Sequence, residues 1–481
     1  MREHFGLSRR EFLVRASGAA ISAMLGAGTA LARQNRKPNI VIIVADDLGW
    51  NAVGYHNQDV KTPNIDERIV GPGIELDNFY VCPMCSPTRA GLMTGRYPIR
   101  YGCARSVIPP QRDYGVPAEE VMLPAALATC GYEHRGAFGK WHLGHLRKRW
   151  HPLSRGFTEF YGCYNGAIDY FTHERDGQLD WHRNWDSSYD RGYSTDLIAE
   201  EAAAFIRRSA YRASPFLCYV PFNAPHAPFQ APKEYESKYG HVQNKALRTY
   251  YAMITAMDSG IGKILDALDE KGIADDTLVW FFSDNGGVGR FATNNLPLKG
   301  AKLTAYEGGV RTVAAVRYPG GYLTKAKITT PVAYIDVLPT LLSLAGATPA
   351  RAGCREIDGI DMNPVLSGRT QSAPQRCLYF YYGQDGPATE MTSVLCDRWK
   401  LVVTGPDIRN GVTDKNGLIL YDIRNDPNET QDVSAGNPDV VRNLAGKLID
   451  YRNLQIPDAI APYHVKVEGF VPPKEWKIEK P

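Results

Sequence analysis

Three features found in many proteins are missing from this sequence, and each absence excludes a class of protein. No apolar run is long enough to span a bilayer, so a stable membrane span is not expected. The 55 Lys and Arg residues nearly balance the 52 Asp and Glu residues, the formal net charge is +3, and no basic stripe stands out. Nucleic acid is therefore not an expected partner. No internal repeat or low-complexity tract is present, so a repeat architecture is excluded as well.

Cysteine is also scarce for so long a chain. Nine cysteines in 481 residues, odd in number and irregularly spaced, exclude a small disulfide scaffold. Some of them can form bridges in an exported protein, but the sequence does not pair them. The composition, 44% hydrophobic and 22% charged, is that of a soluble globular protein with enough chain for two or three domains.

The N-terminus has the features of an export signal over residues 1–32. Arg9 and Arg10 precede Phe-Leu, an Ala/Gly-rich stretch follows over residues 16–31, and Ala-Leu-Ala at 30–32 is a small-residue cleavage site. The paired arginines resemble a twin-arginine signal, and the alternative is an ordinary secretory signal. We expect an exported bacterial protein, periplasmic or extracellular, with the twin-arginine export machinery as a partner.

The pattern of apolar residues predicts an α/β fold. Continuous apolar runs at 39–44, 216–220 and 277–282 suit central strands covered on both faces. Segments 195–209 and 246–268 have apolar residues at helical spacing, so we expect a mainly parallel sheet flanked by helices in a catalytic domain over residues 33–370.

After residue 370 the pattern of apolar residues and turn residues changes. Short strand-like pieces at 377–382, 399–403 and 418–421 precede a helical stretch at about 437–453. These pieces predict a smaller C-terminal subdomain over residues 371–481, an antiparallel sheet with one helix. Its tail after Ile456, rich in Pro and Lys, is expected to wrap the surface.

Oxygen donors follow two of the predicted central strands. Asp46 and Asp47 come directly after the first strand, and Asp284 and Asn285 come after the strand that ends at Phe282. Ligands bind at the carboxyl ends of the strands in open α/β sheets. Three carboxylates and an amide suit a hard cation such as Ca²⁺ or Mg²⁺, whereas each pair alone also fits a plain turn.

Further polar residues lie in loops near these strands. Lys140 and His142 stand two apart and would face the same side of an extended segment. His226 lies between prolines after the strand that ends at Val220, and Lys302 follows the Asp284 turn. Each of the four taken singly also fits a surface lysine or a packed histidine.

Cys82 and Cys85 form a CxxC pair that fits neither of its usual roles. The pair lacks the small thioredoxin-like context of a redox motif, and no second CxxC exists to complete a zinc site. The loop continues into a helix expected to begin near Thr88 or Arg89, which leaves Cys85 as the residue of interest and Cys82 as a packed free thiol.

Cys85-Ser-Pro-Thr-Arg89 has the form Cys-x-Pro-x-Arg, on which sulfatases convert cysteine to formylglycine. The chain resembles a type I sulfatase from about residue 38 to about residue 448. The resemblance is carried by the signature CSPTRAGLMTGRYP around this cysteine and by five further blocks, namely GKWHLG, APHAP, SDNGG, LKGAKLTAYEGGVR and LYDIRNDPNETQDV. It implies an alkaline phosphatase-like fold.

The resemblance also implies roles for individual residues. Ca²⁺ would be bound by Asp46, Asp47, Asp284 and Asn285, with modified Cys85 completing the metal site. The aldehyde and the sulfate would be surrounded by Arg89, Lys140, His142, His226 and Lys302. A formylglycine-generating enzyme is an implied partner.

The mechanism expected for a sulfatase has two stages. One hydroxyl of the formylglycine hydrate attacks sulfur, giving a sulfo-enzyme hemiester while His226 or Lys302 protonates the leaving alcohol. The second hydroxyl then loses its proton to His142, and sulfate departs as the aldehyde re-forms.

A stretch between two of these blocks points to a substrate. GFTEFYGCYNGAIDYFTHERDG, residues 156–177, resembles the corresponding part of N-acetylgalactosamine-4-sulfatases (arylsulfatase B). His173, Glu174, Arg175 and Asp176 are candidates to face a sugar, and the alternative is a loop that only braces the domain. We expect a sulfated galactose or N-acetylgalactosamine unit of a glycosaminoglycan or an algal galactan, with the 4-position suggested by the resemblance.

Three other functions remain open on the sequence. They are an arylsulfatase of broad specificity, a phosphate or phosphonate ester hydrolase of the same superfamily, and a non-catalytic sugar-binding relative. The combination of two histidines with two lysines favours sulfate over phosphate, and an intact Cys85 motif favours an enzyme.

Overall fold

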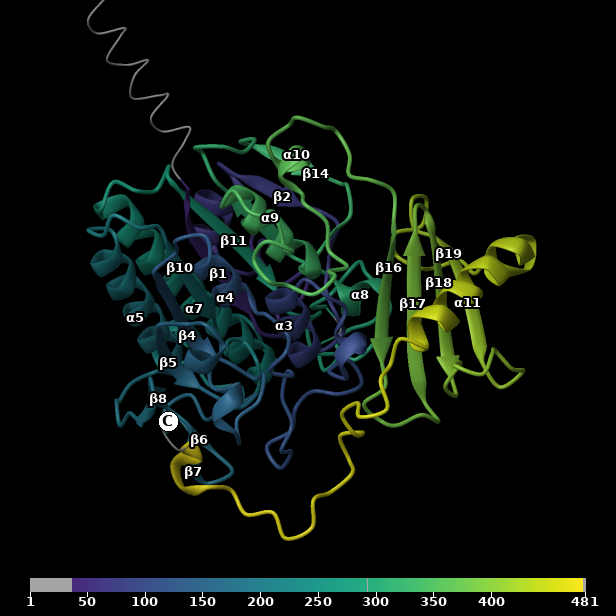
Figure 1. The fold of residues 1–481 in the computed structure, drawn as a ribbon, viewed down its shortest axis with the longest axis horizontal. Helices are drawn as coiled ribbons and strands as arrows, with labels where there is room; N and C mark the ends of the chain where they lie inside the picture. The colour runs from purple at the N-terminus through teal and green to yellow at the C-terminus, as the bar shows by residue number, and fades with distance from the viewer. Residues whose placement is uncertain (1–36, 292, 479–481) are drawn as a thin grey trace, which may run out of the picture. The chain divides into compact units, whose positions relative to one another are not determined.

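The computed structural model describes residues 37–291 and 293–478 (Figure 1). Residues from Asn39 onward form one compact unit. The predicted export signal at residues 1–32 lies outside the described residues. Within the part of the chain that is described, no helix combines the length and the apolar character that crossing a membrane requires.

A ten-stranded, mostly parallel sheet forms the centre of this unit, as the sequence predicts. At its middle, β1 (Asn39–Ala45) lies parallel to β10 (Phe216–Pro221) on one side and to β11 (Thr277–Ser283) on the other. The strand order is β14-β2-β13-β11-β1-β10-β4-β5-β8-β9. The remaining strands are β2 (Ile74–Leu76), β4 (His134–Lys140), β5 (Glu159–Cys163), β8 (His182–Arg183), β9 (Asp186–Ser187), β13 (Ala314–Arg317) and β14 (Ala326–Ile328).

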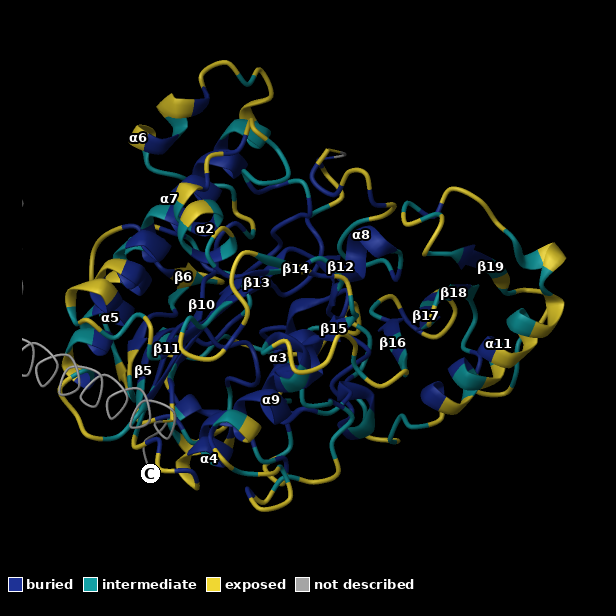
Figure 2. Cartoon of the chain, turned by 90° about the horizontal axis from the view of Figure 1, so that it is seen from above, coloured by how far each residue is buried: buried dark blue, intermediate teal, exposed yellow. Residues whose placement is uncertain are grey.

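Helices cover both faces of the sheet because the central strands are apolar on both faces. Ile40, Ile42 and Val44 of β1 belong to the core beneath α3 (Cys85–Thr94), α4 (Leu123–Ala128) and α9 (Val337–Leu344). Val41 and Ile43 belong to the opposite core, beneath α5 (Ser194–Ser209) and α7 (Lys245–Glu270). In Figure 2 the strands between the two helical layers are dark blue, the colour of buried residues. Both predicted helices, α5 and α7, are confirmed.

Short elements complete this part of the chain. A three-stranded sheet has the order β12-β3-β15, and β6 pairs with β7 in a hairpin. The bounds of these strands and of the short helices are β3 (Phe79–Tyr80), β6 (Glu174–Arg175), β7 (Gln178–Leu179), β12 (Arg311–Thr312), β15 (Val332–Ala333), α2 (Pro63–Ile65), α6 (Lys233–Glu236), α8 (Glu307–Val310) and α10 (Asn363–Leu366).

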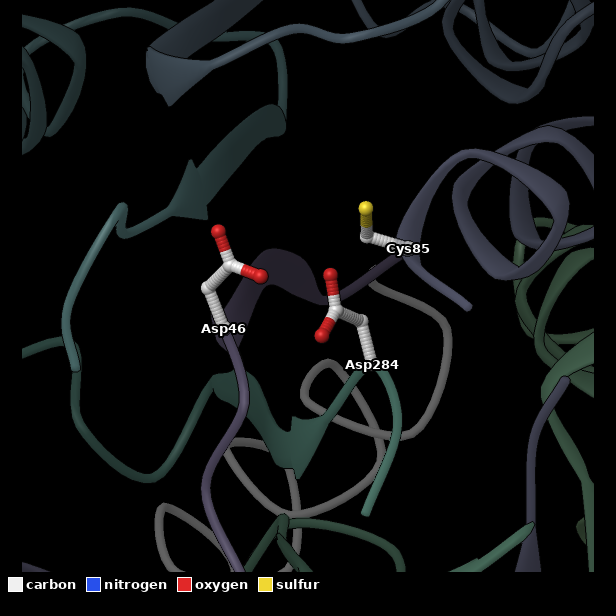
Figure 3. Close-up of side chains that lie close together, drawn as sticks. All are labelled: Asp46, Cys85 and Asp284. Atoms are coloured by element: carbon white, nitrogen blue, oxygen red, sulfur yellow. The ribbon is translucent and has the colours of Figure 1, made fainter. Parts of the chain in front are cut away.

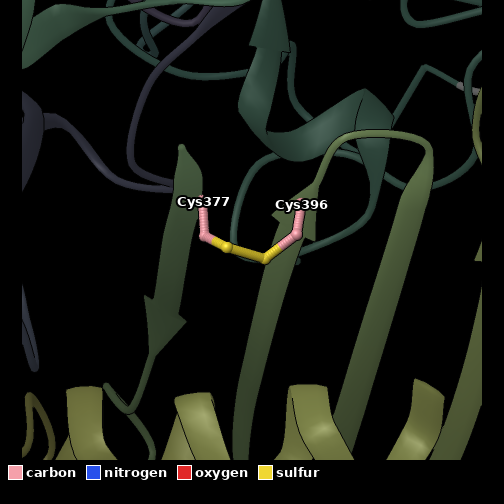
Figure 4. The surroundings of a disulfide bond; sticks show 2 residues. All are labelled: Cys377 and Cys396. Carbon is pink, nitrogen blue, oxygen red and sulfur yellow. A yellow bond between two sulfur atoms is a disulfide. The ribbon is translucent and has the colours of Figure 1, made fainter. Parts of the chain in front are cut away.

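The C-terminal part contains a four-stranded antiparallel sheet with a helix packed on it. Its strands β16 (Cys377–Tyr382), β17 (Glu390–Cys396), β18 (Trp399–Gly405) and β19 (Gly417–Asp422) follow chain order, and α11 (Pro438–Arg452) lies beside them in Figure 1. The sequence predicted three of these strands. It missed β17, where Thr392 and Ser393 interrupt the apolar pattern. Cys377 and Cys396 stand opposite each other in β16 and β17 and form a disulfide (Figure 4).

A buried ionic cluster ties this second sheet to the catalytic part. The Lys400 ammonium on β18 lies 2.7 Å from Glu307 on α8 and 3.0 Å from Glu429, and both Lys400 and Glu307 have fully buried side chains. The Tyr80 hydroxyl donates to the second oxygen of Glu307. Burial raises the pKa of Glu429 to about 7, although Lys400 opposes the rise. One ammonium therefore compensates two carboxyl groups that approach it from separate segments.

Replacing Lys400 with Met should destabilise the protein strongly. The substitution removes the cation of Glu429 and leaves Glu307 with only the more distant Arg311, at 3.9 Å. Breaking a buried ion pair on one side costs about 3–5 kcal/mol. The measurement is denaturant-induced unfolding followed by fluorescence. Lys233→Met, at an exposed lysine, is the matched control and should change the free energy of unfolding by less than about 0.5 kcal/mol. Equal stability of the two variants would contradict the structural role of Lys400.

Candidate active site

The predicted site residues gather at the carboxyl ends of the central strands. Asp46 and Asp47 follow β1, Asp284 and Asn285 follow β11, and Lys140 is the last residue of β4. The backbone N–H of Asp284 donates to the Ala45 carbonyl, which keeps the two strands in register as they leave the sheet. Neighbouring parallel strands place their carboxyl ends at one edge, and this brings together residues that are more than 230 positions apart.

Asp46, Asp284 and Cys85 point toward one another in Figure 3. One carboxylate oxygen from each aspartate and the Cys85 Sγ atom lie within 4.8 Å of one another. Burial raises the pKa of Asp284 to about 6, and the neighbouring Asp46 carboxylate adds to the rise. Burial also raises the pKa of Asp46. Such a group of buried acids is unfavourable on its own and calls for a cation.

The oxygen atoms at this position fit a divalent cation. Asp46 Oδ1 and Asn285 Oδ1 are buried and accept no hydrogen bond from any described residue. The Asn285 amide nitrogen donates to Asp47 Oδ1 at 2.8 Å, so the amide oxygen points the other way, free to ligate a metal. Carboxylate and amide oxygens are the ligands of Ca²⁺ and Mg²⁺. Asp46, Asp47, Asp284 and Asn285 would hold such an ion.

Three cationic side chains balance these acids. The Arg89 guanidinium lies 2.8 Å from Asp284 Oδ2, the Lys140 ammonium 2.5 Å from Asp46 Oδ2, and the Lys302 ammonium 2.6 Å from Asp47 Oδ1. Burial alone would raise the pKa of Asp47, but Lys302 and then His226 outweigh it, and the pKa is lowered. Burial would likewise lower the pKa of Lys302, yet Asp47 raises it, so Lys302 keeps its proton.

Cys85 is the first residue of α3, which corrects the predicted helix start near Thr88 or Arg89. Pro87 looks like a loop residue in the sequence, but proline is tolerated in the first helical turn, where its missing N–H has no partner to lose. Arg89 therefore lies one turn after Cys85 on the same face of the helix. Cys82 is a buried free thiol 3.0 Å from the Tyr334 hydroxyl, as the sequence predicted.

His142 is held with one nitrogen toward Cys85. Its Nε2 lies 3.0 Å from the Ile108 carbonyl oxygen, which can only accept, so Nε2 carries the proton. Burial lowers the pKa of His142 well below its usual range, and the charge on Lys140 lowers it further. The unprotonated Nδ1 therefore faces the Cys85 Sγ at 3.3 Å. Gly166 leaves the space for this ring, because a Cβ there would lie 2.3 Å from a His142 carbon.

His226 is a second histidine that faces the site, on the side of Asp47. Its Nδ1 donates to the Ala227 carbonyl at 2.6 Å, and its Nε2 lies 3.6 Å from Asp47 Oδ2. Partial burial lowers the pKa of His226 to about 3, with Asp47 opposing this shift and Lys302 adding to it. Its Nε2 therefore faces the site as an acceptor until a proton is supplied.

A cavity of about 310 Å³ opens above Cys85, and it is lined by only some of the predicted substrate residues. Arg175 lines the cavity, but His173 and Glu174 do not. His173 is 1% exposed, donates to the Gly192 carbonyl and stacks on Trp181, so it braces the fold around β6 and β7. The cavity is lined by Cys85, Val107, Ile108, Pro109, Pro110, His142, Gly166, Ala167, Arg175, His226, Lys302, Leu303, Gln384 and Tyr463.

A larger cavity, of about 630 Å³, lies away from these groups, between the catalytic part and the C-terminal sheet. Its arginines are already paired with acids, Arg311 with Asp77 at 3.1 Å and Arg424 with Asp397 at 2.7 Å. The chemistry therefore belongs to the smaller cavity, where charged groups face a common space.

Comparisons with known proteins agree with this geometry. Residues 38–347 match the Sulfatase family, and residues 301–454 match the family described as N-sulphoglucosamine sulphohydrolase, C-terminal. The chain belongs to the sulfatase family. It is a sulfuric ester hydrolase with the alkaline phosphatase-like fold, and members of this family generally use a formylglycine and a metal ion.

Several relatives of this sulfatase match most of its length. Arylsulfatase J of Mus musculus is 31% identical over 90% of this chain and 78% of the relative. N-acetylgalactosamine-6-sulfatase of Homo sapiens is 33% identical over 78% of this chain and 74% of the relative. Among solved structures, Ps i-CgsB in complex with k-i-k-neocarrahexaose is 30% identical with a TM-score of 0.80, covering 88% of this chain and 95% of that one.

Replacing Asp284 with Ala should remove divalent cation binding. The substitution removes one of three clustered carboxylates, so Ca²⁺ should bind at least about 100-fold more weakly. Removing a residue that only hydrogen-bonds to a metal ligand already weakens metal binding by up to about 100-fold, and a lost ligand should cost no less. Calorimetric titration with Ca²⁺ and the metal content of the purified protein are the measurements. Asp439→Ala, at an acid 89% exposed on α11, is the control. An Asp284→Ala protein that binds Ca²⁺ like the control would refute the metal assignment.

Proposed function

We propose that this sulfatase hydrolyses a sulfate ester on a galactose or N-acetylgalactosamine unit of a carbohydrate, after Cys85 has been converted to formylglycine. The observation that carries the proposal is the position of the Cys85 side chain. Cys85 is the first residue of a buried helix. Its Sγ atom lies 3.3 Å from the unprotonated Nδ1 of His142 and faces the carboxylates of Asp46 and Asp284. A nucleophile at this point has a base on one side and a cation site on the other.

Formylglycine when hydrated supplies two hydroxyl groups on one carbon, one to attack sulfur and one to release sulfate, and the bound cation supplies positive charge beside the sulfate oxygens. His142 accepts a proton at Nδ1 from the side chain at position 85. Its Nε2–H stays engaged with the Ile108 carbonyl, which fixes the ring in the orientation that this transfer needs. Lys140 and Lys302 neutralise negative charge where the sulfate oxygens would lie.

Two groups are placed to protonate the leaving alcohol. Lys302 lines the cavity with its proton retained, because Asp47 raises its pKa. His226 also lines the cavity, and it would donate from Nε2 once that nitrogen is protonated. The lysine thus supplies a proton that is always present, and the histidine one that must first be taken up.

The relatives support a carbohydrate substrate. One relative is named N-acetylgalactosamine-6-sulfatase, and one structural neighbour is described in complex with a neocarrahexaose. The sequence of residues 156–177 suggested a 4-sulfate, and the position of the ester stays a prediction. Glycosaminoglycan and algal galactan fragments are both included in the proposal.

We also propose that the enzyme acts after export, in the periplasm or outside the cell. The twin-arginine pattern at Arg9 and Arg10 supports this, because that route carries folded proteins and lets a formylglycine-generating enzyme act first. The disulfide between Cys377 and Cys396 fits an oxidising compartment.

The first test is sulfate release from a panel of sulfated galactose and N-acetylgalactosamine oligosaccharides. The protein is co-expressed with a formylglycine-generating enzyme, and mass spectrometry of the peptide that contains residue 85 confirms the aldehyde. We expect release from one sugar class and none with Cys85→Ala, which lacks a nucleophile. Release of phosphate but not sulfate from matched esters, with the aldehyde present, would overturn the proposal.

A second prediction concerns Cys85→Ser. Serine presents one hydroxyl, so it can accept sulfate but has no second hydroxyl to expel it. We expect one sulfate to accumulate per chain, measured by intact mass, with turnover reduced by at least about 10³-fold. Cys82→Ser, at the neighbouring packed thiol, is the control and should retain turnover. Sustained turnover by Cys85→Ser would show that the second hydroxyl is not required.

A further inference from the structure

The last part of the chain returns to the catalytic domain after leaving the C-terminal sheet. In Figure 1 the yellow segment runs from α11 back to the hairpin of β6 and β7. Along the way the Ile460 N–H donates to the Gly102 carbonyl, and the Tyr114 hydroxyl donates to the Asp458 carbonyl. We call residues 458–478 the C-terminal strap. Its backbone is fixed to loops of the catalytic part, and these loops lie close to the candidate active site.

The strap ends in a buried anchor, Trp476. The indole is 0% exposed, and its Nε1–H donates to the Arg175 carbonyl at 2.8 Å. The ring also meets the buried His145 ring edge-on at 5.6 Å. His145 in turn donates from Nε2 to the Pro110 carbonyl at 2.8 Å. Because Arg175 and Pro110 both line the cavity above Cys85, one tryptophan holds two of its walls.

Neighbouring strap residues reinforce the hold on this region. The Glu475 carboxylate accepts hydrogen bonds from Ser187 and Tyr189, and the Glu475 N–H lies 3.3 Å from the Gln178 side-chain oxygen on β7. Four groups within residues 175–189 therefore contact two consecutive strap residues, Glu475 and Trp476. A contact that only covered an apolar surface would not need this many directed hydrogen bonds.

The strap also forms part of the cavity wall. Tyr463 lines the cavity, and its N–H donates to the Gln384 carbonyl at 2.9 Å. Gln384, between β16 and β17, lines the cavity too. Part of the cavity wall is thus built from two residues that lie 299 and 378 positions after Cys85.

Arg175 has a guanidinium without a strong partner. Its side chain is 25% exposed, and its Nε lies 3.3 Å from Oδ1 of the adjacent Asp176, which is itself 44% exposed, without forming a hydrogen bond to it. Lys302, the other lysine or arginine among the described residues that line the cavity, is held by the buried Asp47 carboxylate. A partly desolvated guanidinium facing a cavity is suited to bind a planar or tetrahedral anion.

We propose that the C-terminal strap is a working part of the substrate site, in which Trp476 positions Arg175 to bind a second anionic group of the substrate. This inference rests on the proposed function. The scissile sulfate lies at Cys85, and the second anion is a carboxylate or another sulfate on the same or the adjoining sugar. Trp476 acts through Arg175, so it is a positioning residue.

The test compares two matched disaccharides, one with a single sulfate ester and one with the same ester plus a second anion. In one arm the second anion is a uronate carboxylate, and in the other it is a second sulfate. Arg175→Gln should lower kcat/KM on the doubly charged substrate by about tenfold or more, mainly through KM, as expected for one lost charge-assisted hydrogen bond. The loss on the singly charged substrate should be under threefold. The arm with the larger loss identifies the anion.

Trp476→Phe keeps an aromatic ring and removes the Nε1 donor. It should raise KM for the doubly charged substrate at least threefold. The preference, which is the ratio of kcat/KM on the doubly charged substrate to kcat/KM on the singly charged one, should fall as it does with Arg175→Gln. The matched controls are Arg442→Gln, at an arginine 77% exposed on α11, and Trp399→Phe on β18. Both controls should keep the wild-type preference, and thermal unfolding shows whether each variant is folded.

Two outcomes would overturn the inference. Equal losses on both substrates with Arg175→Gln would mean that the guanidinium acts on the scissile sulfate, and an unchanged preference with Trp476→Phe would mean that the anchor is only structural. Both disaccharides are also titrated into Cys85→Ala protein, with and without Arg175→Gln. The ratio of the Kd values for the two disaccharides tests this inference even if no sulfate is released. A failure to release sulfate would overturn the proposed function and not this inference.

Discussion

The mutual repulsion of three buried carboxylates is the constraint on which this structure depends. Asp46, Asp47 and Asp284 are brought together because β1 and β11 are adjacent parallel strands that end at one edge. Arg89, Lys140 and Lys302 offset their charge from three other segments, and unpaired oxygens on Asp46 and Asn285 leave a place for a cation. The groups that neutralise the acids are also the groups that would neutralise sulfate.

This arrangement couples the fold to the chemistry. Arg89 belongs to α3, Lys140 to the end of β4 and Lys302 to the loop before α8, so each ion pair holds a separate element against the strand ends. The position of Cys85, the proposed nucleophile, is set in the same way, since Cys85 and Arg89 share a helix that Asp284 holds in place. A change at Asp284 should therefore alter both the candidate metal site and the placement of α3.

The sequence predicted those parts of the molecule that local patterns determine. Continuous apolar runs identify β1, β10 and β11, and the polar residues directly after two of them predict a metal site. The start of α3 was misplaced because a proline within the first turn looks like a loop residue. The sequence did not show that Arg175 lines the cavity whereas His173 is buried. His173 stacks on Trp181, which belongs to no motif, and Arg175 is bound by Trp476, which is 301 positions away. Contacts of the strap, such as Tyr463 with Gln384, leave no periodic signal at all.

The disulfide has a consequence for the integrity of the chain. Cys377 and Cys396 close a covalent ring that contains Gln384, a residue of the cavity wall. Loop tips with small and polar residues are preferred sites of proteolytic nicking. A single backbone cut in the connection between β16 and β17 would leave the two fragments joined through sulfur. The segment that carries α11 and the strap would then stay attached to the catalytic domain, so a nicked molecule remains one covalent unit.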